Sequence, residues 1–123
     1  MKETVAVLGA SSKPDRYSHQ AMLLLQQYGH TPIPVHPKQK EILDRKVFGD
    51  LSELDVPVDT VTVYVRPDLL RKQLDDLINL HPNRVIMNPG TEDQMVADEL
   101  ESRDIKVVQA CTLVMLNTGQ FEN

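Results

Sequence analysis

Cysteine and aromatic residues are scarce in this chain: Cys111 is the only cysteine, and there is no tryptophan. A single cysteine excludes an internal disulfide, and a zinc site would have to rely on the four histidines, whose spacing suggests none. No apolar run reaches the roughly 18 residues that are needed to span a bilayer. Since the opening Met1-Lys2-Glu3-Thr4 leads directly into a strand pattern, we expect a cytoplasmic protein without a membrane partner.

Positive charge is also limited. Lysine and arginine together number 13 against 18 aspartates and glutamates, which gives a formal net charge of -5. This balance argues against a general affinity for nucleic acid or for anionic membranes, so any cations that bind an anion must be local. The length of 123 residues and the 41% hydrophobic content predict one domain, residues 1–123, with a packed core.

Short apolar runs alternate with helical patterns along the chain. Strands are predicted at Thr4–Leu8, Thr31–Val35, Thr60–Val65, Arg84–Met87 and Ile105–Val108. Helices are predicted to begin at Tyr17 or Ser18, at Pro67, and after Thr91, which has capping-box spacing with Gln94. The final stretch, 113–123, is interpreted as a short apolar segment followed by a polar tail.

This alternation predicts the α/β class, with a five-stranded parallel sheet between two layers of helices. We expect the five strands in the order 3-2-1-4-5. Pro32 and Pro34 remove two backbone donors from the second strand, so that strand is expected near an edge or only partly paired.

In such a sheet, ligands bind beyond the carboxyl ends of the strands, where the strand order reverses. The first of these ends is the turn Gly9–Ser12. Gly9 allows a tight turn, and the small residues Ala10, Ser11 and Ser12 can present unblocked N–H groups and hydroxyls to a phosphate. Lys13 and Arg16 add positive charge. The other candidate strand ends carry His36, Pro37, Lys38, Arg66, Asn88, Pro89 and Gly90.

The turn matches neither standard nucleotide motif. It has one glycine where a dinucleotide fingerprint has three, and it lacks the Gly-Lys-Ser/Thr of a phosphate-binding loop. NAD sites place an acidic residue at the end of the second strand, whereas this chain has His36 and Lys38 there. Cations at that position favour a ribose phosphate, as in coenzyme A or NADP.

Several ordered segments resemble the small bacterial CoA-binding-domain proteins, and together they cover essentially the whole chain. The segments are Val7–Ser18, Ile33–Lys38, Pro57–Val61, Asn88–Glu92 and Cys111–Leu113. The resemblance implies a Rossmann-like fold similar to the CoA-binding domain of the succinyl-CoA synthetase α subunit. It also implies a protein that binds coenzyme A or an acyl-CoA, usually with no assigned reaction.

The resemblance also implies roles for particular residues. Gly9 to Ser12 would meet the diphosphate with support from Lys13 and Arg16, and His36, Pro37 and Lys38 would lie near the adenosine. His36 stands where many relatives have asparagine.

Structural interpretations of these residues stay open beside the functional ones. Arg66 can pair with Asp68 or cap a helix, and Asn88-Pro89-Gly90 can be simple turn chemistry. Cys111 at a strand end fits a nucleophile, but buried cysteine is common and no acid-base pair stands beside it in sequence.

Four functions are therefore compared. The leading hypothesis is a CoA-binding module without evident catalytic machinery. The alternatives are an enzyme that acts on an acyl-CoA through Cys111, an NADP-binding domain, or a scaffold that forms homo-oligomers through Leu113–Leu116. An unidentified protein partner is also considered.

Overall fold

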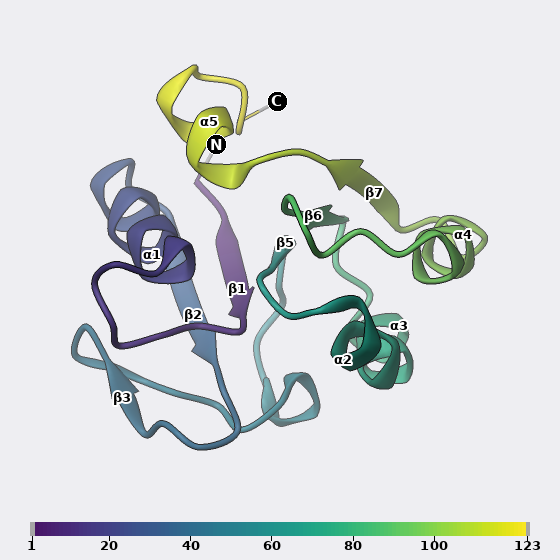
Figure 1. The fold of residues 1–123 in the computed structure, drawn as a ribbon, viewed down its shortest axis with the longest axis horizontal. Coiled ribbons are helices and arrows are strands. Elements are labelled where there is room, and N and C mark those ends of the chain that lie inside the picture. The colour runs from purple at the N-terminus through teal and green to yellow at the C-terminus, as the bar shows by residue number, and fades with distance from the viewer. Residues whose placement is uncertain (1, 123) are drawn as a thin grey trace.

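The computed structural model describes residues 2–122 and shows a central sheet between two layers of helices (Figure 1). The strands of this sheet are β1 (Thr4–Leu8), β2 (Thr31–Val35), β5 (Thr60–Val63), β6 (Arg84–Met87) and β7 (Lys106–Gln109). The helices are α1 (Tyr17–Gln27), α2 (Pro67–Lys72), α3 (Leu74–Leu80), α4 (Gln94–Glu101) and α5 (Thr112–Asn117). A small hairpin of β3 (Glu41–Ile42) and β4 (Arg45–Lys46) and the 3-10 turn η1 (Leu51–Glu53) lie between β2 and β5.

All neighbouring strands of the five-stranded sheet are parallel, in the order β2-β1-β5-β6-β7. The predicted Rossmann-like α/β class with a five-stranded parallel sheet is confirmed. The predicted order 3-2-1-4-5 is wrong, because the third sheet strand, β5, lies beside β1 and not beyond β2. Counted along the chain, the order is 2-1-3-4-5.

The prolines of β2 explain this edge position. Thr31 N–H faces β1 and donates to Glu3 O at 2.9 Å, so the alternate residues Pro32 and Pro34 face outward. Proline has no N–H to donate to another strand on that side. The outer edge is instead covered locally by Phe48, whose N–H donates to Pro34 O at 3.0 Å. A full strand beyond β2 would lose its donors at both prolines.

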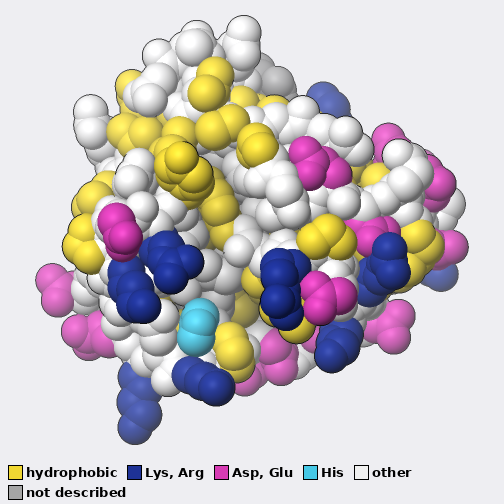
Figure 2. Space-filling view, in the orientation of Figure 1, with side chains coloured by type: hydrophobic (Ala, Val, Ile, Leu, Met, Phe, Trp, Pro, Cys, Tyr) yellow, Lys and Arg dark blue, Asp and Glu magenta, His cyan; other side chains and the backbone are white. Residues whose placement is uncertain are grey.

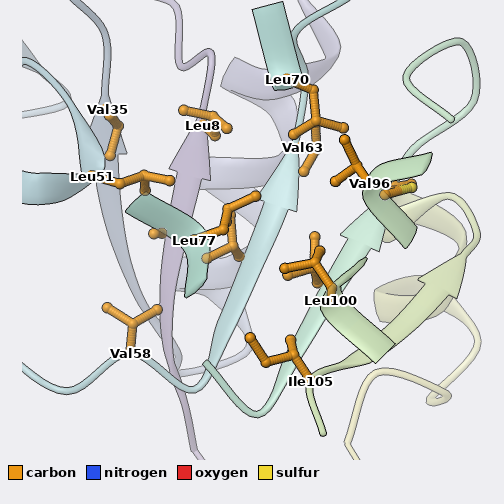
Figure 3. Close-up of a cluster of buried hydrophobic side chains, with 14 of the residues drawn as sticks. Leu8, Val35, Leu51, Val58, Val63, Leu70, Leu77, Val96, Leu100 and Ile105 are labelled. Atoms are coloured by element: carbon orange, nitrogen blue, oxygen red, sulfur yellow. The ribbon is translucent and has the colours of Figure 1, made fainter. Parts of the chain in front are cut away.

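The two faces of the sheet carry separate hydrophobic clusters. One cluster packs α2, α3 and α4 against one face through Leu70, Leu77, Val96 and Leu100, together with Leu51 (Figure 3). The other packs α1 and α5 against the opposite face through the buried residues Met22, Leu25, Met115 and Leu116. Alternate residues of β1 supply both clusters, as the pleat of a doubly covered strand requires.

Three local predictions need correction. The helix from Pro67 is interrupted at Gln73 and forms α2 and α3. The N-cap of α4 is Asp93, which accepts from Val96 N–H at 3.1 Å, while the Thr91 hydroxyl donates to Asn88 O at 2.8 Å, so Thr91 does not form a capping box with Gln94. The terminal apolar segment contains a helix, α5.

Among residues 2–122, no helix is both long enough and apolar enough to cross a lipid bilayer.

Candidate functional site

A cleft of about 880 Å³ opens at the carboxyl edge of the sheet. Cationic side chains stand on both sides of the hollow, as the space-filling view shows (Figure 2). Ten of the predicted site residues line it: Gly9, Ala10, Ser11, Lys13, Arg16, His36, Pro37, Arg66, Pro89 and Gly90. Three others do not line it: Ser12, Lys38 and Asn88.

The turn after β1 folds back over the end of β2. Gly9 has φ +91°, a conformation that favours glycine, and the N–H groups of Gly9 and Ala10 both donate to Val35 O, at 3.1 and 3.2 Å. The prediction that these two N–H groups are unblocked is therefore wrong. These two hydrogen bonds hold the turn against β2, because both N–H groups share the carbonyl of Val35, the last residue of that strand.

The start of α1 provides the free donors. Its N-cap, Arg16, makes no side-chain cap hydrogen bond, and no acidic residue stands in the first turn. Tyr17 and Ser18, the first two helical residues, line the cleft together with Lys13. The uncapped N–H groups coincide with the positive end of the helix dipole, and the cations Lys13 and Arg16 lie nearby. This combination favours the binding of an anion.

Two side chains brace the turn from outside. His19, a buried residue of α1, lies with its Nδ1 2.8 Å from Ser11 O, which fits an N–H that donates to the carbonyl. Ser12 N–H donates to Gln39 Oε1 at 3.1 Å, and Gln39 itself lines the cleft. The turn is therefore held on one side by its own helix and on the other by the segment after β2.

His36 organises that segment. Its Nδ1 accepts hydrogen bonds from Lys38 N–H at 3.0 Å and Gln39 N–H at 3.3 Å. Burial, and then the nearby Lys38 charge, lower the pKa of His36, which keeps the imidazole neutral and able to accept. His36 thus caps a turn and also lines the cleft. The exposed Lys38 follows it on the chain.

The opposite wall comes from the end of β5. Arg66 is exposed and its Nε lies 3.4 Å from Asp68 Oδ1, so the predicted surface ion pair is present at the N-cap of α2. Tyr64 lines the cleft beneath it. Burial raises the pKa of Tyr64 to about 12, partly offset by the neighbouring hydroxyls of Thr62 and Thr112, so its phenol stays protonated.

Asn88 serves the framework of the site. It is buried, its Nδ2 donates to Thr62 Oγ1 at 2.7 Å and to Val63 O at 2.8 Å, and its Oδ1 accepts from Thr112 N–H at 2.9 Å. This one amide ties β6 to β5 and to the start of α5. The residues after it, Pro89 and Gly90, reach the cleft.

Cys111 is half-buried, is the N-cap residue of α5, and does not belong to the lining of the cleft. Within residues 2–122, no three His, Cys, Asp or Glu side chains are grouped so as to hold a metal ion.

Sequence reasoning missed several residues of the lining. They are Leu8, Tyr17, Ser18, Val35, Gln39, Gly49, Asp50, Tyr64, Leu69 and Gln73. The position of Tyr17 and Ser18 at a predicted helix start was the available indication. Gly49 and Asp50 come from the irregular segment 39–57, which the bridge between Val35 and Phe48 holds beside the end of β2.

The sequence profile of the CoA binding domain matches residues 3–117. This chain belongs to the CoA binding domain family. The resemblance inferred from the sequence is thereby confirmed.

Individual relatives agree with this assignment. One crystal structure of an uncharacterized protein is 36% identical to this chain, with a TM-score of 0.94. The match covers 98% of this chain and 99% of the chain in that structure. A Thermus thermophilus structure is 30% identical, with a TM-score of 0.89, and covers 98% of this chain and 91% of its own. The uncharacterized Bacillus subtilis protein YneT is 41% identical over 66 residues, which span 54% of this chain and about half, 49%, of YneT.

Proposed function

We propose that this CoA binding domain, residues 1–123, binds coenzyme A in the cleft at the carboxyl edge of the sheet. The observation that carries the proposal is the uncapped start of α1, which lines the cleft together with Lys13 and Arg16. This arrangement suits the diphosphate of the ligand. Family membership supports coenzyme A over other anions.

The end of β2 supports a nucleotide with a phosphorylated ribose. His36, Pro37 and Gln39 line the cleft and Lys38 is exposed beside them, whereas the acidic residue that NAD sites use is missing from this strand end. A cation there attracts the 3′-phosphate of coenzyme A. The 2′-phosphate of NADP would satisfy the same charge, which makes NADP the competing ligand.

Calorimetric titration with coenzyme A, dephospho-CoA, NADP and NAD tests the proposal. We expect coenzyme A to bind most tightly and dephospho-CoA more weakly, because the latter lacks the 3′-phosphate. Lys38→Glu should remove the difference between these two ligands. Lys106→Glu is the matched control, because it has the same net charge as Lys38→Glu. Lys106 is the first residue of β7, the outer strand on the side of the sheet away from β2.

Tighter binding of NAD or NADP than of coenzyme A would contradict the proposal. Loss of the 3′-phosphate preference in both lysine variants would show that net charge, and not Lys38, produces it.

A further inference from the structure

Gln73 carries a buried amide oxygen that has no hydrogen-bond partner. The residue stands where α2 ends and α3 begins, yet its side chain makes no capping hydrogen bond. Its Oε1 is buried and accepts no hydrogen bond from any group among residues 2–122. Buried polar groups are nearly always paired, because an unpaired acceptor loses its bonds to water without replacement. Since Gln73 also lines the cleft, a bound ligand can supply the missing partner.

The side of α2 that faces the cleft changes in character along its length. Arg66, Leu69 and Gln73 all line the cleft, and their spacing of three and four residues places them on one side of the helix. Leu70, in contrast, is fully buried in the cluster beneath the helix. The helix therefore presents to the cleft an arginine at its start, an aliphatic side chain in its middle and an amide at its end.

A short segment connects this amide to the end of β2. Phe48 N–H donates to Pro34 O at 3.0 Å, and Phe48 O accepts from His36 N–H at 2.9 Å. Two residues further on, Asp50 lines the cleft and is the N-cap of η1, which packs against α3. The segment thus runs along the cleft from the end of β2 to the helix pair that Gln73 joins.

The chemistry of this part of the cleft suits a nucleobase. The proposed site puts the phosphorylated ribose at the end of β2, and the base is attached to the same ribose. Val35, Pro37 and Leu69 line the cleft and offer apolar surface to the faces of a flat ring. The amide of Gln73 suits the edge of adenine, because the 6-amino donor and the N7 acceptor of adenine complement the oxygen and the NH2 group of a glutamine.

On the basis of the proposed coenzyme A site, we propose that Gln73 determines the base specificity of the cleft by binding the 6-amino edge of adenine. A 6-oxo purine such as hypoxanthine carries an acceptor in place of that amino group, so it would face Gln73 Oε1 with a second acceptor. Rotation of the amide does not remove the mismatch. O6 and N7 are both acceptors, so the amide oxygen still faces one of them.

Calorimetric titration with coenzyme A and with its deaminated analogue, in which hypoxanthine replaces adenine, tests the inference. A matched pair of hydrogen bonds to a base discriminates by about fivefold or more, so coenzyme A should bind at least about fivefold more tightly than the analogue. Gln73→Met keeps the length of the side chain and removes the amide, so the ratio should fall to about one. Gln26→Met is the matched control, because Gln26 is half-buried in α1 and does not line the cleft.

Urea unfolding separates this role from a structural one. Because Gln73 Oε1 accepts no hydrogen bond from the described chain, Gln73→Met should not lower the free energy of unfolding. A loss of stability together with an unchanged binding ratio would assign Gln73 to the fold and overturn the inference.

The binding outcomes distinguish the inference from the proposed function. If coenzyme A and its analogue bind equally to the wild type, the base specificity is overturned and the coenzyme A site stands. If Gln73→Met weakens both ligands equally, the amide contacts a part that they share, such as the pantetheine arm, and the inference is again overturned. A ratio that falls equally in Gln26→Met has the same consequence. If neither ligand binds, the proposed function itself fails.

Discussion

Replacement of Gly9 by alanine tests the turn on which the cleft depends. Gly9 has φ +91°, and a Cβ built there would lie 2.9 Å from Tyr64 O and 2.9 Å from Val65 Cγ1. The carbonyl cannot easily retreat, because Tyr64 N–H donates to Leu8 O at 2.8 Å and fixes the end of β5 against β1. The new methyl group therefore meets the Tyr64 backbone as well as the short, branched side chain of Val65.

Two separate effects lower the free energy of unfolding of Gly9→Ala. A non-glycine residue held in the left-handed region costs about 1–3 kcal/mol. Forcing an extra methyl group into a packed position costs a further 1–3 kcal/mol, approximately. We therefore expect Gly9→Ala to lower the free energy of unfolding by about 2–6 kcal/mol, a large part of the roughly 5–15 kcal/mol that is typical of a domain.

Urea unfolding followed by far-ultraviolet circular dichroism measures this change, since the chain has no tryptophan to report by fluorescence. Gly119→Ala is the matched control: Gly119 has φ +73°, but no atom lies within 4 Å of its added Cβ. The control should show only the conformational contribution. Equal losses of stability in the two variants would refute the steric reasoning at Gly9.

Other variants test the framework and the charges of the site. Asn88→Ala should destabilise by about 2–4 kcal/mol in urea unfolding, because it leaves Thr112 N–H and Val63 O buried without their partner. Burial alone raises the pKa of Asp93, but the Val96 N–H and Arg71, whose Nε lies 2.6 Å away, outweigh burial and hold that pKa below its usual value. The stability contributed by this carboxylate is present at neutral pH and is lost as the pH falls through the lowered pKa. The free energy of unfolding of Asp93→Asn, measured in urea at acidic pH, should therefore depend less on pH than that of the wild type. His36→Asn should keep coenzyme A binding in calorimetry, because an amide oxygen can accept from the same turn, whereas His36→Ala should weaken it several-fold.

Local chemistry made most of the fold predictable from the sequence. β1 and β2 have the predicted bounds because their β-branched and apolar runs end at Gly9 and at His36-Pro37. Glycine and proline commonly end a regular element. The start of α2 was predicted because proline suits the first helical position. The cap of α4 was misplaced because both Thr91 and Asp93 are good N-cap residues. In the structure the Thr91 hydroxyl donates to Asn88 O, while Asp93 accepts from Val96 N–H and from Arg71 Nε.

The candidate site was less predictable because long-range hydrogen bonds shape it. Nothing near Gly9 in sequence shows that its N–H and that of Ala10 are taken by Val35 O. Likewise, the residue pair Ser12 and Gln39 meets only because β2 lies beside β1. Residue types at strand ends indicated the location of the cleft, while the free donors had to be found from the structure.

The strand order determines where the cationic side chains lie around the cleft at the carboxyl edge of the sheet. In the order 3-2-1-4-5, Arg66 would stand beyond His36, and the cations would gather on one side of the turn. In the observed order, β2 and β5 flank β1, so His36 and Arg66 stand on opposite walls with the start of α1 between them. The next strands, β6 and β7, continue the sheet away from these two walls. A cleft with this arrangement of walls favours a ligand whose anionic part lies over the end of β1.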